Sequence, residues 1–251
     1  MSVKRSKFHS FVCLFTLFVC FSASSLFVST AHADDNKDKG GFSLGSTRVI
    51  YDGGKKEATI TVINSAKNAP FLAQSWVTEY APGEKKPAQA PFLVTPPLYR
   101  QDQGKNMLRI IRTGGQMPSD RESVFWLNVK AIPAARESLK GKNTLQFAYV
   151  LRVKLFYRPQ GLSGEPSQAT DNLSFARKGS MLVVRNSGSY YVTFNTLSVG
   201  GKTVKDASSL MVPPKGEQLY PLPAGATGGN QVSFRALNDF GGVLPARTVT
   251  F

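Results

Sequence analysis

The side chains that most often carry out catalysis or bind metals are confined to the N-terminal end of the sequence. The only cysteines are Cys13 and Cys20, and the only histidines are His9 and His32. Beyond them the chain cannot form Ser-His or Cys-His nucleophilic pairs, histidine or thiolate zinc sites, or disulfide bonds. Among the carboxylates, Glu79, Glu84 and Glu122 stand in no recognisable arrangement for acid-base hydrolysis. The sequence therefore predicts a binding protein that is not an enzyme and has no metal and no cofactor.

The N-terminal segment has the layout of a secretory signal. Its three early positive charges are Lys4, Arg5 and Lys7. An apolar run from Phe11 to Val28 follows, and Ala31-His32-Ala33 offers small residues for cleavage. We expect residues 1–33 to be a cleaved signal peptide, which would remove every cysteine and histidine. An uncleaved membrane anchor is the alternative, but serine and threonine interrupt the apolar run, and a cleavage motif follows it.

The chain is strongly basic, with 31 Lys and Arg against 16 Asp and Glu and a net charge of +15. Such a charge favours acidic partners or surfaces, although it also serves simply to keep a protein soluble. Nucleic acid is not expected as a partner, because the chain carries an export signal and its basic residues are dispersed along the sequence.

After an expected flexible arm at residues 34–41, short apolar-polar runs recur with turn residues between them, and no helical periodicity is sustained. The expected strands are Phe42–Tyr51, Ala58–Ile63, Phe71–Tyr80, Met107–Arg112, Ser123–Lys130, Thr144–Tyr157, Met181–Asn186, Tyr190–Val199, Glu217–Leu222, Gln231–Leu237 and Arg247–Phe251. Pro159–Asn172 is rich in Pro, Gly, Ser and Gln, as in a linker. The pattern predicts an all-β protein of two immunoglobulin-like β-sandwich domains, at 42–160 and 161–251.

The segment Thr144–Arg158 is unusually long for a strand, and it has one continuous apolar face. That face is formed by Leu145, Phe147, Tyr149, Leu151, Val153 and Leu155. Its first part has no charge, proline or glycine to protect an exposed edge. Two interpretations stay open: an ordinary core strand, or a strand added to the open sheet of another protein.

Four sequence blocks together resemble the PapD-like family of periplasmic pilus chaperones. They are Thr47–Gly53 (TRVIYDG), Pro118–Asn128 (PSDRESVFWLN), Lys154–Pro159 (KLFYRP) and Asn238–Gly242 (NDFGG). The blocks occur in the family's order and span nearly all of the chain beyond the signal. The short loop at Pro133–Asn143 and the lack of a cysteine pair in the exported chain resemble the short-loop subclass.

The resemblance implies a chaperone of the chaperone-usher pathway, located in the periplasm, that acts by donor-strand complementation. Its implied partners are fimbrial subunits and an outer-membrane usher, and its exposed strand implies possible self-association of the free form. By resemblance, the donated side chains are Leu145, Phe147 and Tyr149. Arg48 and Lys154 correspond to the basic residues that bind the C-terminal carboxylate of the subunit.

The resemblance also implies two domains joined at an angle and held there by an interdomain charged cluster. The cluster residues are Glu122, Arg158 and Asp239. No stable membrane insertion is expected after signal cleavage. The alternative function is a secreted β-sandwich adhesin or carbohydrate-binding module, in which surface aromatic residues stack on sugars; the candidates for that role are Trp76, Trp126 and Tyr190.

Overall fold

The computed structural model describes residues 40–82, 86–134, 145–226 and 229–251. All of these residues belong to one compact unit. The expected signal peptide, most of the expected arm, Glu84, Thr144 and most of the Pro133–Asn143 loop lie outside the described residues.

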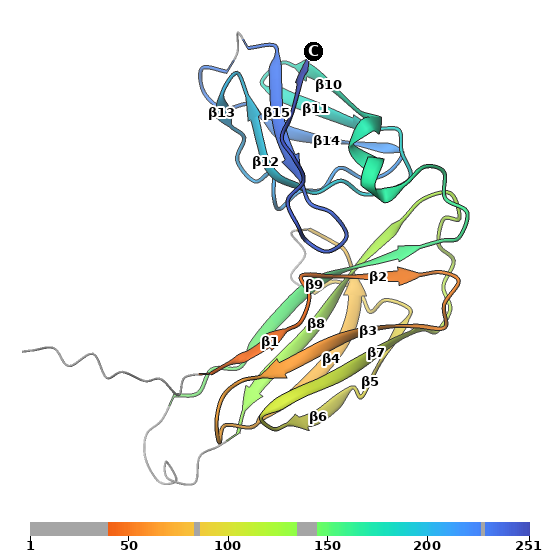
Figure 1. Ribbon diagram of the computed structural model, residues 1–251, viewed down its shortest axis with the longest axis vertical. Coiled ribbons are helices and arrows are strands. Elements are labelled where there is room, and N and C mark those ends of the chain that lie inside the picture. The colour runs from red at the N-terminus through yellow and green to blue at the C-terminus, as the bar shows by residue number, and fades with distance from the viewer. Residues whose placement is uncertain (1–39, 83–85, 135–144, 227–228) are drawn as a thin grey trace, which may run out of the picture. The chain divides into compact units, whose positions relative to one another are not determined.

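The first half of the described chain forms two β-sheets (Figure 1). One has the order β1-β3-β7-β5 and the other β2-β9-β8-β4-β6. The strands are β1 (Phe42–Leu44), β2 (Arg48–Asp52), β3 (Glu57–Asn64), β4 (Phe71–Glu79), β5 (Phe92–Thr95), β6 (Leu98–Gln101), β7 (Gly104–Arg112), β8 (Ser123–Pro133) and β9 (Tyr149–Arg158). All pairings are antiparallel except that of β2 with β9, which is parallel.

The second half forms two further sheets, ordered β10-β11-β14 and β13-β12-β15-β16. A 3-10 helix, η2 (Pro166–Asn172), precedes them. The strands are β10 (Leu173–Lys178), β11 (Met181–Asn186), β12 (Phe194–Val199), β13 (Lys202–Thr203), β14 (Gly216–Pro221), β15 (Gln231–Ala236) and β16 (Arg247–Thr250). Each half is therefore a pair of sheets built mainly from hairpin-like antiparallel contacts.

Each pair of sheets encloses its own apolar core, as expected when alternate strand residues point inward. The first core includes Leu108 and Ile110 from one sheet and Leu127 and Leu155 from the other. The second core is centred on fully buried side chains that include Phe194, Tyr220, Leu182 and Leu197. Burying a side chain of this size stabilises the folded state by about 1.5–3 kcal/mol. The prediction of an all-β fold with two sandwiches is confirmed.

The structure differs from the sequence prediction at several strands. The expected run Phe42–Tyr51 is divided, because β1 pairs with β3 in one sheet and β2 pairs with β9 in the other. Strands β5, β6, β10 and β13 were not predicted. β5 and β6 are four residues each, and they flank Pro96-Pro97. η2 lies within the predicted linker Pro159–Asn172, and β10 follows directly after it.

Candidate functional site: a basic pair beside an open strand edge

Arg48 and Lys154 lie side by side on the outer face of the first sandwich. Arg48 of β2 is the register partner of Lys154 of β9, and partners in adjacent strands point to the same face. Their neighbours Val49 and Leu155 are also register partners and are buried in the core. The two cations, separated widely in the sequence, therefore meet on the side opposite the core.

The Arg48–Lys154 pair is partly buried, and no acidic side chain in the described parts of the chain forms an ion pair with it. Within the described residues neither side chain makes an ion pair, and the Arg48 Nε is buried without a hydrogen-bond partner. Burial lowers the pKa of Arg48, although Asp239 and Glu122 attract its charge. Burial, followed by repulsion from Arg48, lowers the pKa of Lys154 to about 8. Two crowded cations with spare donors suit the binding of an anion, and a carboxylate matches them well.

Strand β9 has an open edge beside this pair. β8 pairs with β9 from Tyr149 to Tyr157, whereas β2 pairs only with its second half, from Lys154 to Arg158. Among the described strands, none pairs with the β2 side of β9 before Lys154. The backbone groups on that edge are therefore available to another strand, and the open stretch ends at the cation pair.

The predicted donor residues lead into this open edge. Leu145 is 79% exposed, Phe147 is 71% exposed and Tyr149 is 39% exposed, values unusual for large apolar side chains. β9 begins at Tyr149, and residues 145–148 form no strand, whereas the predicted strand start, Thr144, lies outside the described residues. The β8–β9 ladder ends at Ala131 and Tyr149, two residues before Pro133, which has no N–H to donate.

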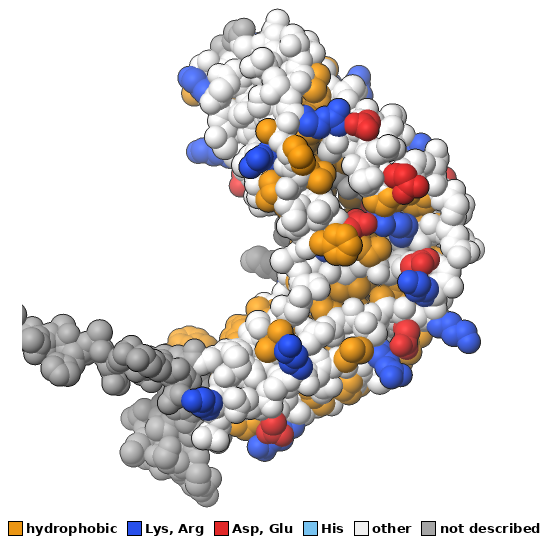
Figure 2. Space-filling model, viewed as in Figure 1, with side chains coloured by type: hydrophobic (Ala, Val, Ile, Leu, Met, Phe, Trp, Pro, Cys, Tyr) orange, Lys and Arg blue, Asp and Glu red, His pale blue; other side chains and the backbone are white. Residues whose placement is uncertain are grey.

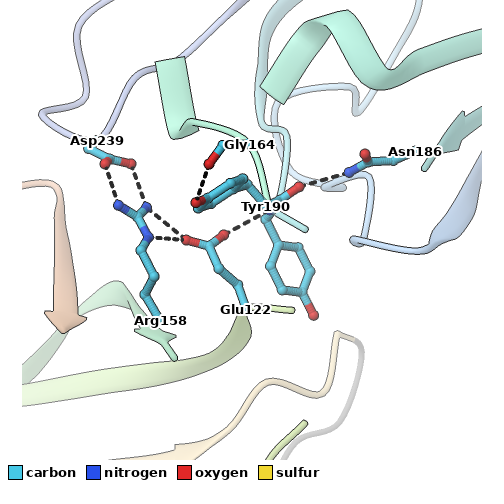
Figure 3. Close-up of polar contacts among 7 residues, drawn as sticks. Glu122, Arg158, Gly164, Asn186, Tyr190 and Asp239 are labelled. Carbon is cyan, nitrogen blue, oxygen red and sulfur yellow. Dashed lines mark hydrogen bonds and ion pairs between the residues drawn. The ribbon is translucent and has the colours of Figure 1, made fainter. Parts of the chain in front are cut away.

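Glu122, Arg158 and Asp239 form a closed charged cluster (Figure 3). Arg158 donates to Glu122 Oε1 through Nε at 2.8 Å, and to Asp239 through Nη1 at 2.8 Å and Nη2 at 3.0 Å. Burial acts to lower the pKa of Arg158, but hydrogen bonds to Asp239 and the attraction of Glu122 outweigh it and raise the pKa. Burial raises the pKa of Glu122, while Arg158 and a backbone N–H act in the opposite direction.

The same cluster bonds the first sandwich to main-chain groups of the second half. The Glu122 carboxylate accepts the Tyr191 N–H at 2.8 Å, and the Glu122 N–H donates to the Ser189 carbonyl at 2.9 Å. The guanidinium of Arg158 also lies 5.1 Å from the ring centroid of Tyr190 (Figure 3). These backbone partners were not predictable from sequence motifs, because any residue except proline can supply them.

Sequence reasoning missed Arg152, which lies two residues before Lys154 on the same face of β9. Its Nε donates to Asn128 Oδ1 at 2.9 Å, and its guanidinium lies 5.6 Å from the ring centroid of Trp126. Trp126 itself packs against Tyr80, with ring centroids 5.1 Å apart. In the sequence, Arg152 had no signal beyond its even position in the alternating pattern.

The surface view agrees with a dispersed charge distribution. Figure 2 shows Lys and Arg side chains spread over the visible face, with Asp and Glu among them, and no single large basic patch. None of the helices in the described parts of the chain has the length and apolar character needed to cross a membrane.

The fold and site together define a two-sandwich β-protein with a strand edge open beside a pair of cations. Comparisons with known proteins give the family. The model of the "Pili and flagellar-assembly chaperone, PapD N-terminal domain" matches residues 41–163, and that of the "Pili assembly chaperone PapD, C-terminal domain" matches residues 168–248. The chain belongs to the PapD-like family of pilus-assembly chaperones, as the sequence blocks predicted.

Curated relatives and solved structures agree with this membership. The chain is 47% identical over 203 residues to the probable fimbrial chaperone LpfB of Escherichia coli O157:H7, covering 80% of this chain and 85% of that protein. It is 43% identical over 210 residues to the chaperone FimC of E. coli K12, covering 83% of each. The crystal structure of the E. coli chaperone DraB matches with a TM-score of 0.72 and 37% identity, covering 84% of this chain and 97% of that one.

A solved complex is also similar. The structure described as the Salmonella enterica SafA pilin in complex with the SafB chaperone matches with a TM-score of 0.74 and 34% identity. The match covers 84% of this chain and 96% of that chain.

Proposed function

We propose that this protein is a periplasmic chaperone of fimbrial subunits in the chaperone-usher pathway. It captures a subunit by adding β9 and the segment before it to the subunit's incomplete sheet, and it delivers the subunit to an outer-membrane usher. The observation that carries the proposal is the open edge of β9, which ends at Arg48 and Lys154. Membership of the family, and relatives named as fimbrial chaperones, support it.

The geometry supports one direction for the captured strand in this proposal. A strand that pairs with the open edge of β9 lies in line with β2, which occupies the same edge from Arg48 onward. If the strand's C-terminal carboxylate binds Arg48 and Lys154, its chain must run toward Lys154, as β9 does. The subunit strand is therefore parallel to β9 and ends where β2 begins.

The exposed apolar residues supply the binding energy in this proposal. Leu145, Phe147 and Tyr149 share one face, and burying each in an apolar groove of the subunit contributes about 1.5–3 kcal/mol before the cost of ordering the segment. Backbone hydrogen bonds along the edge add affinity that does not depend on sequence. The same exposed residues make pairing between two free copies of the chaperone a further expectation.

The cation pair sets the register of the captured strand. A carboxylate placed between Arg48 and Lys154 accepts hydrogen bonds from the guanidinium of Arg48, whose buried Nε has no partner in the described structure. Its negative charge also reduces the repulsion between the two cations. Because the carboxylate sits at the chain end, only one alignment of the subunit strand brings it there. Capture requires no bond to be made or broken, so the protein is proposed to act without enzymatic turnover.

The proposal is tested by replacing Arg48 and co-exporting the variant with a tagged fimbrial subunit from the same gene cluster. Arg48→Ala is expected to reduce the amount of chaperone recovered with the subunit at least tenfold, because the loss of a partly buried charge contact at an interface costs about 2 kcal/mol or more. The free variant is expected to keep its urea unfolding midpoint, since Arg48 makes no ion pair among the described residues.

Lys178→Ala is the matched control, because Lys178 is an exposed cation at the end of β10. It should leave capture unchanged. Recovery of Arg48→Ala with the subunit at the level of the unchanged protein would contradict the proposed anchor. Failure of the unchanged protein to capture any subunit would contradict the function itself.

A further inference from the structure

The guanidinium of Arg152 is held by side-chain contacts on the outer face of β9, the face that also carries Lys154. Its Nε donates to Oδ1 of Asn128, a residue with no exposed surface. The Asn128 amide is oriented by its own donor bonds to Thr78 Oγ1 at 3.2 Å and to the Trp126 carbonyl at 3.1 Å. With the Trp126 ring beneath it, the Arg152 side chain is preorganised rather than freely mobile.

The terminal Nη donors of Arg152 have no hydrogen-bond partner among the described residues. Within the described residues, its contacts are Asn128 and the Trp126 ring, and it forms no ion pair. An arginine has five N–H donors, so both terminal nitrogen atoms of Arg152 remain able to bind an acceptor. A rigid guanidinium with free terminal donors is suited to recognising a carboxylate or an amide oxygen.

The strand register indicates which residue of a captured subunit meets Arg152. Arg48 already occupies the position opposite Lys154, so an incoming chain end cannot lie there. Successive strand residues are about 3.3 Å apart. Along the line of β2, the last residue of an incoming strand must stop roughly two residue positions before Arg48 to leave room for its terminal carboxylate. The last residue of the incoming strand then lies opposite Arg152, and residues opposite each other share a face of the sheet.

We propose that Arg152 is a specificity-determining residue that reads the side chain of the subunit's last residue. It favours a side chain with an oxygen acceptor, such as Glu or Gln, and disfavours a basic one. Arg48 and Lys154 hold the terminal carboxylate, which every chain possesses, so they do not distinguish one subunit from another. This inference rests on the proposed function, and it assigns selectivity to a position beside the anchor.

The test uses one tagged fimbrial subunit co-exported with the full-length chaperone, in versions whose last residue is Glu, Ala or Lys. The measured quantity is the ratio of chaperone to subunit after affinity purification. The unchanged chaperone is expected to retain the Glu version about fivefold better than the Lys version, as for a partly exposed charge contact. Arg152→Glu should reverse this order, and Arg152→Gln should remove most of the preference.

Lys178→Glu is the matched charge control and should keep the original order, because Lys178 lies on β10 of the second half. Urea unfolding of each free variant establishes that it is folded. The same order for Arg152→Glu as for the unchanged chaperone overturns the inference, as does equal retention of all versions by the unchanged chaperone. Those results leave the proposed function intact, whereas no retention of any version by the unchanged chaperone overturns both.

Discussion

The two ends of β9 differ in how completely their backbone groups and charged side chains find partners within the protein. At its C-terminal end, β9 pairs with β8 as far as Tyr157 and with β2 as far as Arg158, and Arg158 is neutralised by Glu122 and Asp239. At its N-terminal end one edge is open, Tyr149 is partly exposed, and the residues before it are more exposed still. Lys154 lies between these ends, beside Arg48 and without an ion pair among the described residues.

This contrast supports the proposal that one strand contributes to folding at one end and to subunit binding at the other. The charge on Arg158 is stabilised by its neighbours, which raise its pKa, whereas the charge on Lys154 is disfavoured, and its pKa falls to about 8. A satisfied cation contributes to the folded state, and a disfavoured one gains from an added anion. Substitutions along the strand are therefore expected to separate stability from capture.

The largest effect on stability is expected at the C-terminal end of β9, where Arg158 forms ion pairs with Glu122 and Asp239. Arg158→Ala leaves the Glu122 carboxylate, whose side chain is 3% exposed, without its counter-ion. Removing one partner of a buried ion pair destabilises a protein by about 3–5 kcal/mol. Urea unfolding followed by circular dichroism measures the change. Arg185→Ala is the control, because the Arg185–Glu217 pair is exposed and contributes about 0.5 kcal/mol or less. Equal losses in the two variants would remove the distinction between the ends.

At the open end, Phe147→Asp is expected to abolish most capture with little change in stability. The aspartate would place a charge in an apolar groove of the subunit, while the free chaperone already exposes 71% of Phe147. Copurification with a tagged subunit measures capture, and urea unfolding measures stability. Gln146→Asp adds the same charge one residue earlier, on the other side of the alternating pattern, and should capture normally. Unfolding of free Phe147→Asp would instead assign this residue to the core.

The smallest expected effect is the pH dependence of subunit affinity caused by Lys154, in the middle of β9. The Lys154 ammonium loses its proton as pH rises through about 8 in the free chaperone. A bound carboxylate favours the protonated form and raises this pKa, so binding above pH 8 must take up a proton. Affinity is therefore expected to be constant near pH 7 and to fall several-fold between pH 7.5 and 9, within the limit of tenfold per pH unit.

Lys154→Arg separates this titration from other causes, because arginine keeps its charge throughout that range. Subunit retention by Lys154→Arg is expected to vary less with pH than retention by the unchanged protein. Identical pH profiles for the two proteins would show that Lys154 is not the titrating group.

Much of the fold could be predicted from the alternation of apolar and polar residues. β11 was predicted with its observed bounds, and β3, β4 and β8 were predicted within a few residues. Buried positions alternate along most of β3 and β4, whereas β8 and β11 are rich in buried apolar residues, many of them β-branched. β10 was missed because most of its residues are only partly buried, so its pattern is weak. The change of sheet between β1 and β2 was also missed, since local sequence does not specify which strand a segment pairs with.

The candidate site was predictable only in part, because it also depends on which strands pair. The sequence blocks named Arg48 and Lys154, and the register of β2 with β9 brings them together. The functions of these residues remain predictions. No block marked Arg152, because its position depends on the buried amide of Asn128 and on a ring in the adjacent strand. Contacts that depend on register and on buried partners do not appear in a linear pattern.

The bonds between Glu122 and the second half of the chain have an evolutionary consequence. Ser189 and Tyr191 contribute only main-chain atoms to these bonds. Substitution of either side chain, other than Tyr191 by proline, leaves the bonded groups in place, whereas replacing Glu122 by a residue without a side-chain oxygen removes the acceptor of the Tyr191 N–H. These bonds therefore tolerate most substitutions at Ser189 and Tyr191, but they restrict substitution at Glu122.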